Sequence, residues 1–220
     1  MKRHLKRMNM PQPWKLLRKD TKFITRPHAG SHPLERGIAL ATIIRDYLHL
    51  AKNTKEVRAI LSKQEILING KRRRDPKYNV GFMDVISIPL MQKFHLITLD
   101  TDGFLTIKEL AAQQATQRFT KVTMKKHHQG KFQIGCLDGT TLLVKEKAPS
   151  IGDTLILSIP ENKLVAVHPL VKGAHILIFA GKTRGVHTVV KDIKEKTVAF
   201  EHKGKIVETN KDYALVITHE

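Results

Sequence analysis

The residues best suited to bind a ligand are a run of four cations, Lys71–Arg74, that directly follows Asn69-Gly70. Two further cations, Lys55 and Arg58, are three positions apart, which places them on one face of a helix. Ammonium and guanidinium groups are the side chains that bind phosphate in proteins. The pattern therefore predicts a phosphate-binding site. The alternative, solvated charges that protect an edge strand from aggregation, needs fewer consecutive cations than this.

Local signals place these cations on a helix and a hairpin. Thr54 is a typical N-cap and apolar residues follow it at helical spacing, so a helix is predicted over 54–63. Asn69-Gly70 between two short runs is a strong signal for a β-hairpin. Strand alternation after the turn would separate the cations into two pairs, Lys71 with Arg73 and Arg72 with Arg74.

The remaining periodicity predicts an α+β multi-domain chain. Apolar residues at helical spacing between Leu34 and Leu48 predict a helix over 34–48. Beyond residue 92 the pattern is one of short strands and turns, interrupted by a helix predicted over 108–118. The predicted strands are 84–88, 94–100, 104–107, 132–137, 140–144, 154–159, 164–167, 175–179, 187–191, 197–201, 205–208 and 213–218.

The charge of the chain indicates a polyanionic partner. Its 39 Lys and Arg residues exceed its 20 Asp and Glu residues, and the net charge is +19. Residues 1–36 hold ten of these cations and only two acidic residues. Trp14 and Phe23 are interleaved with the cations, so this segment is expected to be an extended basic arm that becomes ordered against its partner. A membrane surface is the rival polyanion, but the chain has neither a long amphipathic basic helix nor an apolar run of about 20 residues.

The sequence carries no constellation typical of an enzyme or a metal site. Phosphate-loop, nucleophile-elbow, zinc-protease and dinucleotide-binding motifs are absent. The pair His127-His128 is interpreted as part of a basic loop, and Cys136 as a small core residue. Asp100 and Asp102 flank a turn and are interpreted as turn residues. We therefore expect no catalytic residue, no metal, no cofactor and no small-molecule substrate.

The region around the cation run resembles a known RNA-binding module. The stretch ILINGKRRRDPKYNVGFMDVISI at Ile66–Ile88, with the helix before it, is similar to the small domain first described in bacterial ribosomal protein S4. The stretches HLKRMNMPQPW at His4–Trp14, TRPHAGSHPLER at Thr25–Arg36 and GFMDVISI at Gly81–Ile88 together resemble the archaeal and eukaryotic small-subunit ribosomal protein family S4e, and an archaeal member above all. The resemblance covers essentially the whole chain.

This resemblance implies an architecture of four parts. They are a basic N-terminal arm at 1–36, a small α/β S4-like module of the alpha-L type at 37–92, a central β-rich domain at 93–170 and a KOW-type SH3-like barrel at 171–220. The stretch HILIFAGKTRG at His175–Gly185 has the strand, glycine turn and basic loop of the KOW motif, with glycines that let backbone approach RNA.

The resemblance also implies a function and a location. We expect a structural constituent of the small ribosomal subunit in the cytoplasm, with small-subunit ribosomal RNA and neighbouring ribosomal proteins as partners and no membrane contact. The alternatives are a non-ribosomal RNA-binding factor, for example in assembly, transcription or translation, and an RNA-modifying enzyme that carries the same module. The residues expected to bind RNA are Lys2, Arg3, Lys6, Arg7, Arg18, Arg26, Lys55, Arg58, Lys71, Arg72, Arg73, Arg74, Lys77, Lys125, Lys126, Lys182 and Arg184.

Overall fold

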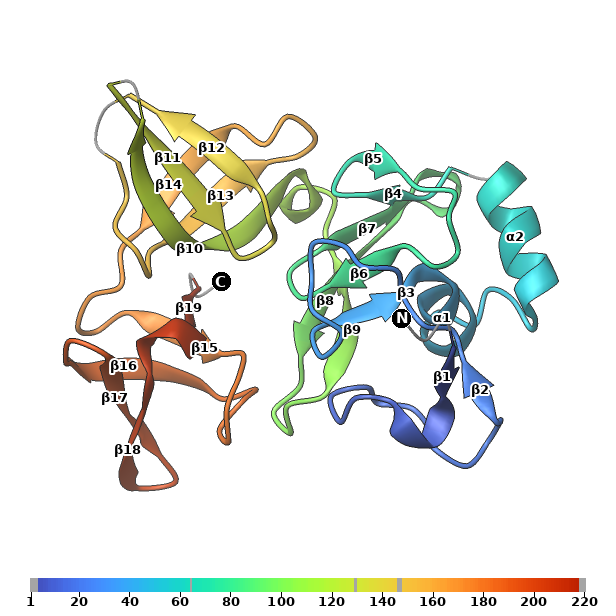
Figure 1. The fold of residues 1–220 in the computed structure, drawn as a ribbon, viewed down its shortest axis with the longest axis horizontal. Coiled ribbons are helices and arrows are strands. Elements are labelled where there is room, and N and C mark those ends of the chain that lie inside the picture. The colour runs from blue at the N-terminus through green and yellow to red at the C-terminus, as the bar shows by residue number, and fades with distance from the viewer. Residues whose placement is uncertain (1–3, 64, 129, 146–147, 218–220) are drawn as a thin grey trace. The chain divides into compact units, whose positions relative to one another are not determined.

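The computed structural model of the chain describes residues 4–63, 65–128, 130–145 and 148–217, which are mostly β with few helices (Figure 1). They form two compact units. The first contains the described residues up to Thr98 together with Phe104–Arg118, and the second contains Leu99–Gly103 and the described residues from Phe119 onward. The chain therefore passes from one unit to the other at both ends of the short segment 99–103 and again after residue 118.

A five-stranded sheet in the order β5-β4-β7-β8-β9 is the largest sheet of the first unit. Its strands are β4 (Leu67–Ile68), β5 (Lys71–Arg72), β7 (Val85–Ile88), β8 (Lys93–Leu99) and β9 (Leu105–Leu110). All of β7 is buried, as expected for a central apolar strand. Helix α2 (Thr54–Lys63) has Val57 and Leu61 on its buried side. The predicted helix, hairpin and strand of this region are confirmed, and the sheet continues past residue 92.

The N-cap of α2 lies one residue earlier than predicted. The side chain of Asn53 accepts a hydrogen bond from the backbone nitrogen of Glu56 (3.0 Å) and donates one to the Glu56 carboxylate (2.7 Å). The first of these bonds caps the helix, because it satisfies a backbone donor that an uncapped helix would leave without a partner. The Glu56 carboxylate also accepts a hydrogen bond from the backbone nitrogen of Lys52 (2.7 Å). Thr54 is therefore the first residue of the helix.

The helix predicted over 34–48 is wrong in its first part. Gly37–Ala39 forms strand β3, which pairs antiparallel with β6 (Asn79–Gly81), and the chain becomes helical only at α1 (Leu40–Thr42) and the following π-helical turn Ile43–Tyr47. Every residue from 37 to 44 is buried. A fully buried apolar run has no polar face that could distinguish a strand from a helix, so spacing alone misassigned it.

The N-terminal arm is part of the folded unit, which corrects the expectation of an arm ordered only against RNA. Strands β1 (Leu5–Lys6) and β2 (Phe23–Ile24) pair with each other. Trp14 is 2% exposed and bridges to Leu105 of β9. The backbone nitrogen of Lys15 donates to the Tyr47 hydroxyl at 3.2 Å. Burial of large apolar side chains stabilises a fold, so the arm contributes to the stability of the free protein.

The second unit contains two antiparallel five-stranded sheets, in the orders β12-β11-β10-β13-β14 and β18-β17-β16-β15-β19. The first comprises β10 (Gln117–His128), β11 (Lys131–Cys136), β12 (Thr141–Val144), β13 (Thr154–Ser158) and β14 (Leu164–His168). The second comprises β15 (His175–Ile178), β16 (His187–Ile193), β17 (Thr197–His202), β18 (Lys205–Asn210) and β19 (Ala214–Val216). The strands predicted here are confirmed within a few residues. Cys136 lies in the core of the first sheet, as interpreted.

The helix predicted over 108–118 is wrong, and strand β10 was not predicted. Lys108–Leu110 completes β9, and only the single 3-10 turn Gln114–Thr116 is helical before β10 begins. Alanine and glutamine favour a helix, but this preference is weak and sheet pairing overrides it. Further 3-10 turns are Arg7–Asn9, Pro89–Met91 and Lys211–Tyr213.

A buried cation joins the two sheets of the second unit. Lys121 of β10 is 2% exposed, and its ammonium donates to the carbonyl oxygens of Lys211 and Ala214, both at 2.7 Å. Burial lowers the pKa of Lys121 to about 8, because a charged group loses its hydration there. A second link runs from the backbone nitrogen of Val216 to the Thr154 hydroxyl at 2.9 Å.

The buried indole gives a prediction for the arm. Replacing Trp14 with Ala should lower the free energy of unfolding by about 3–5 kcal/mol, because a large buried ring is lost and leaves a cavity. Chemical denaturation followed by circular dichroism measures the change. Leu17→Ala is the matched control, since Leu17 is 79% exposed. Equal stability of the Trp14 variant and the wild type would show that the arm is not part of the folded core.

The buried ammonium gives a prediction for alkaline pH. Between pH 8 and 10.5 the unfolded chain holds a proton on Lys121 that the folded chain has released, so raising the pH favours the folded state. Relative to Lys121→Met, the stability of the wild type should rise by up to about 3 kcal/mol across this interval. Urea unfolding at a series of pH values tests this. Parallel pH curves for the two proteins would contradict the lowered pKa.

Candidate nucleic-acid interface

The predicted cations of helix α2 and the β4–β5 hairpin form one exposed face of the first unit. Asn69 and Gly70 have positive φ values of 50° and 74°, the geometry of a type I′ turn, which joins β4 and β5 directly. The guanidinium of Arg72 reaches the Ser62 carbonyl near the end of α2 at 3.4 Å, so the hairpin lies beside the helix. We use the name helix–hairpin face for five exposed cations, which are Lys55 and Arg58 of α2, Lys71 and Arg72 of β5, and Arg74 shortly after β5.

Arg73 was predicted to bind RNA together with the other cations of the run, but it is not one of the exposed cations of this face. Strand β5 ends at Arg72, so the alternation expected across all four cations does not continue. The Arg73 guanidinium is half-buried and lies over the Tyr78 ring, 4.4 Å from the ring centroid. A cation over an aromatic face is attracted by the ring quadrupole, so Arg73 helps to fix the chain after the hairpin.

The turn of the hairpin is held by the buried carboxylate of Asp84. One of its oxygens accepts hydrogen bonds from His32 Nε2 (3.0 Å) and from the Gly81 backbone nitrogen (2.8 Å), and the other accepts from Asn69 Nδ2 (2.7 Å). Burial alone would raise the pKa of Asp84, but the charge and hydrogen bond of His32 and the bonds from Gly81 and Asn69 lower it. This network connects the arm, the hairpin and the start of β7.

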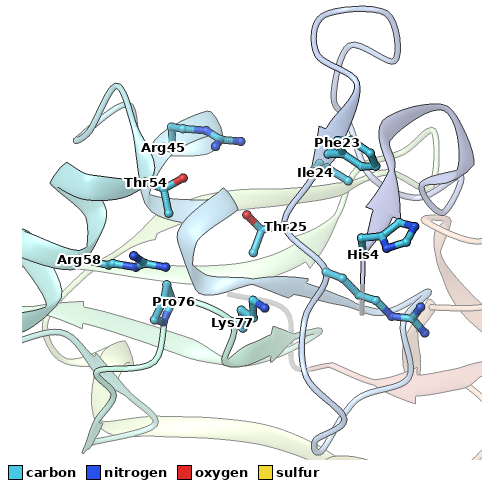
Figure 2. Close-up of a pocket in the computed structure, with 10 residues that line it drawn as sticks. His4, Phe23, Ile24, Thr25, Arg45, Thr54, Arg58, Pro76 and Lys77 are labelled. Atoms are coloured by element: carbon cyan, nitrogen blue, oxygen red, sulfur yellow. The ribbon is translucent and has the colours of Figure 1, made fainter. Parts of the chain in front are cut away.

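A basic pocket of about 320 Å³ lies between the arm, the π-helical turn, the start of α2 and the loop before β6 (Figure 2). Predicted residues Arg26, Arg58 and Lys77 line it, together with Arg45, which sequence reasoning missed. The remaining lining residues are His4, Phe23, Ile24, Thr25, Thr54 and Pro76. Arg45 makes two hydrogen bonds to the Asp46 carboxylate, at 2.9 and 2.7 Å, and these raise the pKa of Arg45.

The pocket could not be read from the sequence because it is made by segments far apart in the chain. Arg45 lies in a run that spacing assigned to one long helix, where a lone arginine is an ordinary surface residue. The only local signal was Phe23, an aromatic residue among the cations of the arm.

The arm cations differ in what surrounds them. Lys6 is exposed, whereas Arg7 is 4% exposed and bonds to the Leu17 carbonyl, to the Thr21 hydroxyl (3.1 Å) and to Asp20 (3.4 Å). The contacts of Arg7 therefore lie inside the arm, contrary to its prediction as an RNA ligand. Half-buried Arg18 donates to two backbone carbonyls of the arm. Lys2 and Arg3 lie outside the described residues.

In the second unit, two of the predicted cations are exposed and two contact the protein. Lys126 and Lys182 are exposed. The half-buried Lys125 donates to the Ala148 carbonyl at 3.0 Å. A Cβ placed on Gly103 would lie 2.4 Å from Cγ of Arg184, so this arginine packs against the turn of residues 100–103.

The glycine loop before β16 is used for packing. A Cβ on Gly185 would lie 2.1 Å from the Asp100 carbonyl oxygen, so only glycine allows the loop to approach this turn. From the sequence, the glycines of this loop were expected to let the backbone approach RNA. At Gly185 the close partner is the protein backbone.

The described part of the chain offers no group of three or more metal-ligating His, Cys, Asp or Glu side chains. Within the same residues, no helix is long and apolar enough to span a membrane.

Family models match three successive stretches of the chain. The RS4NT domain matches residues 1–35, the S4 domain matches 40–86, and the ribosomal family S4e matches 91–164. The S4 match includes α2, the β4–β5 hairpin and Asp84. Together the helix–hairpin face and these matches define the class of the chain, an RNA-binding ribosomal protein.

Whole-chain relatives extend these matches. Small ribosomal subunit protein eS4 of Saccharolobus islandicus is 33% identical over 220 residues, which cover 94% of this chain and 92% of the relative. The eS4 protein of Methanocella arvoryzae is 32% identical, with 97% and 93% covered. The crystal structure of 30S ribosomal protein S4e from Thermoplasma acidophilum superposes with a TM-score of 0.72 at 29% identity, and covers 83% of this chain and 95% of that one. The chain belongs to the S4e family of ribosomal proteins, and the relatives named above are archaeal. This family is structural rather than enzymatic.

The buried Asp84 network gives a prediction at acid and neutral pH. Asp84→Asn should lower the free energy of unfolding at neutral pH by about 3–5 kcal/mol, because an amide cannot accept all three hydrogen bonds and His32 loses its charged partner. Since the folded-state pKa is lowered, this stabilisation is present above the ordinary value of 3.8 and is lost as the pH falls through the folded value. The variant should therefore lose less stability than the wild type on acidification.

Urea unfolding at neutral and acid pH measures both effects. Glu65→Gln is the control, because Glu65 is exposed. A variant as stable as the wild type at neutral pH would show that the network does not hold the hairpin turn.

Proposed function

We propose that this chain, a structural protein of the small ribosomal subunit in the cytoplasm, binds ribosomal RNA mainly through the helix–hairpin face. The observation that carries the proposal is the convergence of exposed cations from two elements, with Arg72 bound to the end of α2. The match of the S4 domain to residues 40–86 supports the same face. Phosphate contacts from these side chains fix the position of the protein, and the shape of the folded RNA supplies most of the specificity.

Further contacts come from the other parts of the chain. The proposed division is the arm at 1–36, the S4-like module at 37–92, the central domain at 93–170 and a KOW-type SH3-like barrel at 171–220. Cations in all four of these parts add to the binding, and neighbouring ribosomal proteins cover other surfaces. The additional RNA contacts proposed are Lys2, Arg3, Lys6, Arg18, Arg26, Lys77, Lys125, Lys126, Lys182 and Arg184.

Two of the predicted arginines act differently in this proposal. Arg7 is accounted for by its bonds inside the arm, and Arg73 by its position over Tyr78. Both support the segments that carry the exposed cations. Their replacement would therefore change the fold as well as the binding, which makes them poor probes of RNA contact.

The proposal predicts that RNA affinity falls steeply with salt concentration and that the helix–hairpin face accounts for part of this slope. The triple variant Lys71→Gln, Arg72→Gln, Arg74→Gln should bind isolated small-subunit ribosomal RNA at least about tenfold more weakly than the wild type. Its log–log salt slope should fall by about two to three, because each lost phosphate contact removes a little under one. Filter binding at several salt concentrations measures both quantities.

A matched control separates this site from the overall charge. Lys163→Gln, Lys172→Gln and Lys194→Gln together remove the same charge from exposed ion pairs of the second unit. Equal weakening by both triple variants would mean that binding depends on net charge and not on the helix–hairpin face. Circular dichroism should show an unchanged fold for both.

A further inference from the structure

The basic pocket combines two kinds of side chain that a duplex-binding surface does not need together. In Figure 2, Arg45, Arg58 and Lys77 lie along one side of the pocket, and Phe23 and His4 lie along the other. The pocket therefore has a cationic side and an aromatic side, and the ten described residues that line it include no Asp or Glu.

The cationic side fits phosphate. Arg45 is neutralised by Asp46, to which it is bound through two hydrogen bonds. Arg58 of α2 and Lys77 of the loop before β6 also line the pocket, and they come from separate segments of the chain. Positive groups that converge from separate segments, with no carboxylate among them, raise the local potential and attract an anion such as a phosphodiester.

The aromatic side fits a base. Phe23 of β2 is 49% exposed, although β2 is held by its pairing with β1. The ring of His4 meets it edge-on, with centroids 5.7 Å apart, and the ammonium of Lys22 lies 5.6 Å from its centroid. Phe23 thus lines the pocket as a half-exposed aromatic residue and is not part of the buried apolar core. Aromatic rings in this setting are the platforms on which proteins stack unpaired bases.

We propose that this pocket holds one unpaired nucleotide of the RNA, with its base stacked on Phe23 and its backbone phosphate bound by Arg58 and Lys77. This inference rests on the proposed RNA-binding function and adds a single-stranded element to it. The volume of about 320 Å³ is at the small end of ligand sites, which begin near about 300 Å³, so the pocket suits one nucleotide and not a longer segment.

Base-paired RNA does not fit the aromatic side. The bases of an A-form helix stack on each other, and its deep major groove is closed to side chains. A duplex could reach the cations of the pocket through its phosphates but would leave Phe23 without a base. The phenyl ring therefore distinguishes the two forms of RNA, whereas the cations do not.

The test uses the full chain and a short single-stranded oligoadenylate in which one adenine is replaced by the fluorescent analogue 2-aminopurine. In the free strand the neighbouring adenines quench 2-aminopurine by stacking, so moving this base out of their stack onto Phe23 should raise its fluorescence when the wild type binds. Phe23→Leu should abolish this increase and weaken binding about tenfold, the scale of one lost base–aromatic stack. Phe23→Tyr keeps the ring and should keep both signals. Leu90→Ala, at a residue 73% exposed elsewhere in the first unit, is the surface control.

A short RNA duplex is the second probe. Arg58→Gln should weaken binding of both RNAs, whereas Phe23→Leu should leave the affinity for the duplex unchanged. A fluorescence increase and a single-strand affinity of Phe23→Leu equal to those of the wild type would overturn the pocket proposal. If the triple variant of the helix–hairpin face still weakened ribosomal RNA binding, the proposed function would stand without it. If the triple variant bound ribosomal RNA as tightly as the wild type, the proposed function itself would be rejected.

Discussion

The carboxylate of Asp84 connects the end of the arm, the hairpin turn and the end of β6, and the helix–hairpin face depends on it. It accepts hydrogen bonds from His32 at the end of the arm, from Gly81 at the end of β6, and from Asn69 in the hairpin turn. A buried carboxylate is costly unless its acceptor positions are filled, and here each partner fills one. The turn that carries the cations is therefore fixed by a group that is buried inside the protein.

The chain uses its cations in two ways that composition does not separate. Lys55, Arg58 and Lys71 are exposed and free to meet phosphates, whereas Arg7 and Lys121 are buried and bind carbonyl or side-chain oxygens of the protein. Extended arms and small β units have limited apolar cores. A long basic side chain that reaches several oxygens supplements such a core by tying distant segments together.

Local signals predicted much of this structure, because helix α2, the Asn69-Gly70 hairpin and most strands depend on near neighbours in the chain. They failed where burial is complete on all sides, as in the strand Gly37–Ala39, and where pairing overrides helix preference, as in β9. The cations of the helix–hairpin face were predictable because helix and hairpin are consecutive. The basic pocket was not, since Phe23, Arg45 and Arg58 meet only after the arm has packed on the unit.

The turn between β8 and β9 belongs to the second unit although its two strands lie in the sheet of the first. The Asp100 carbonyl and Gly103 pack there against Gly185 and Arg184. No single cut of the polypeptide separates the two units, because a break after residue 118 leaves residues 99–103 on the other fragment. A fragment that ends at residue 118 would hold the β8–β9 hairpin without the contacts of its turn, and a fragment that begins at residue 119 would hold the loop at Gly185 without its partner. Limited proteolysis should therefore release neither fragment as an intact domain.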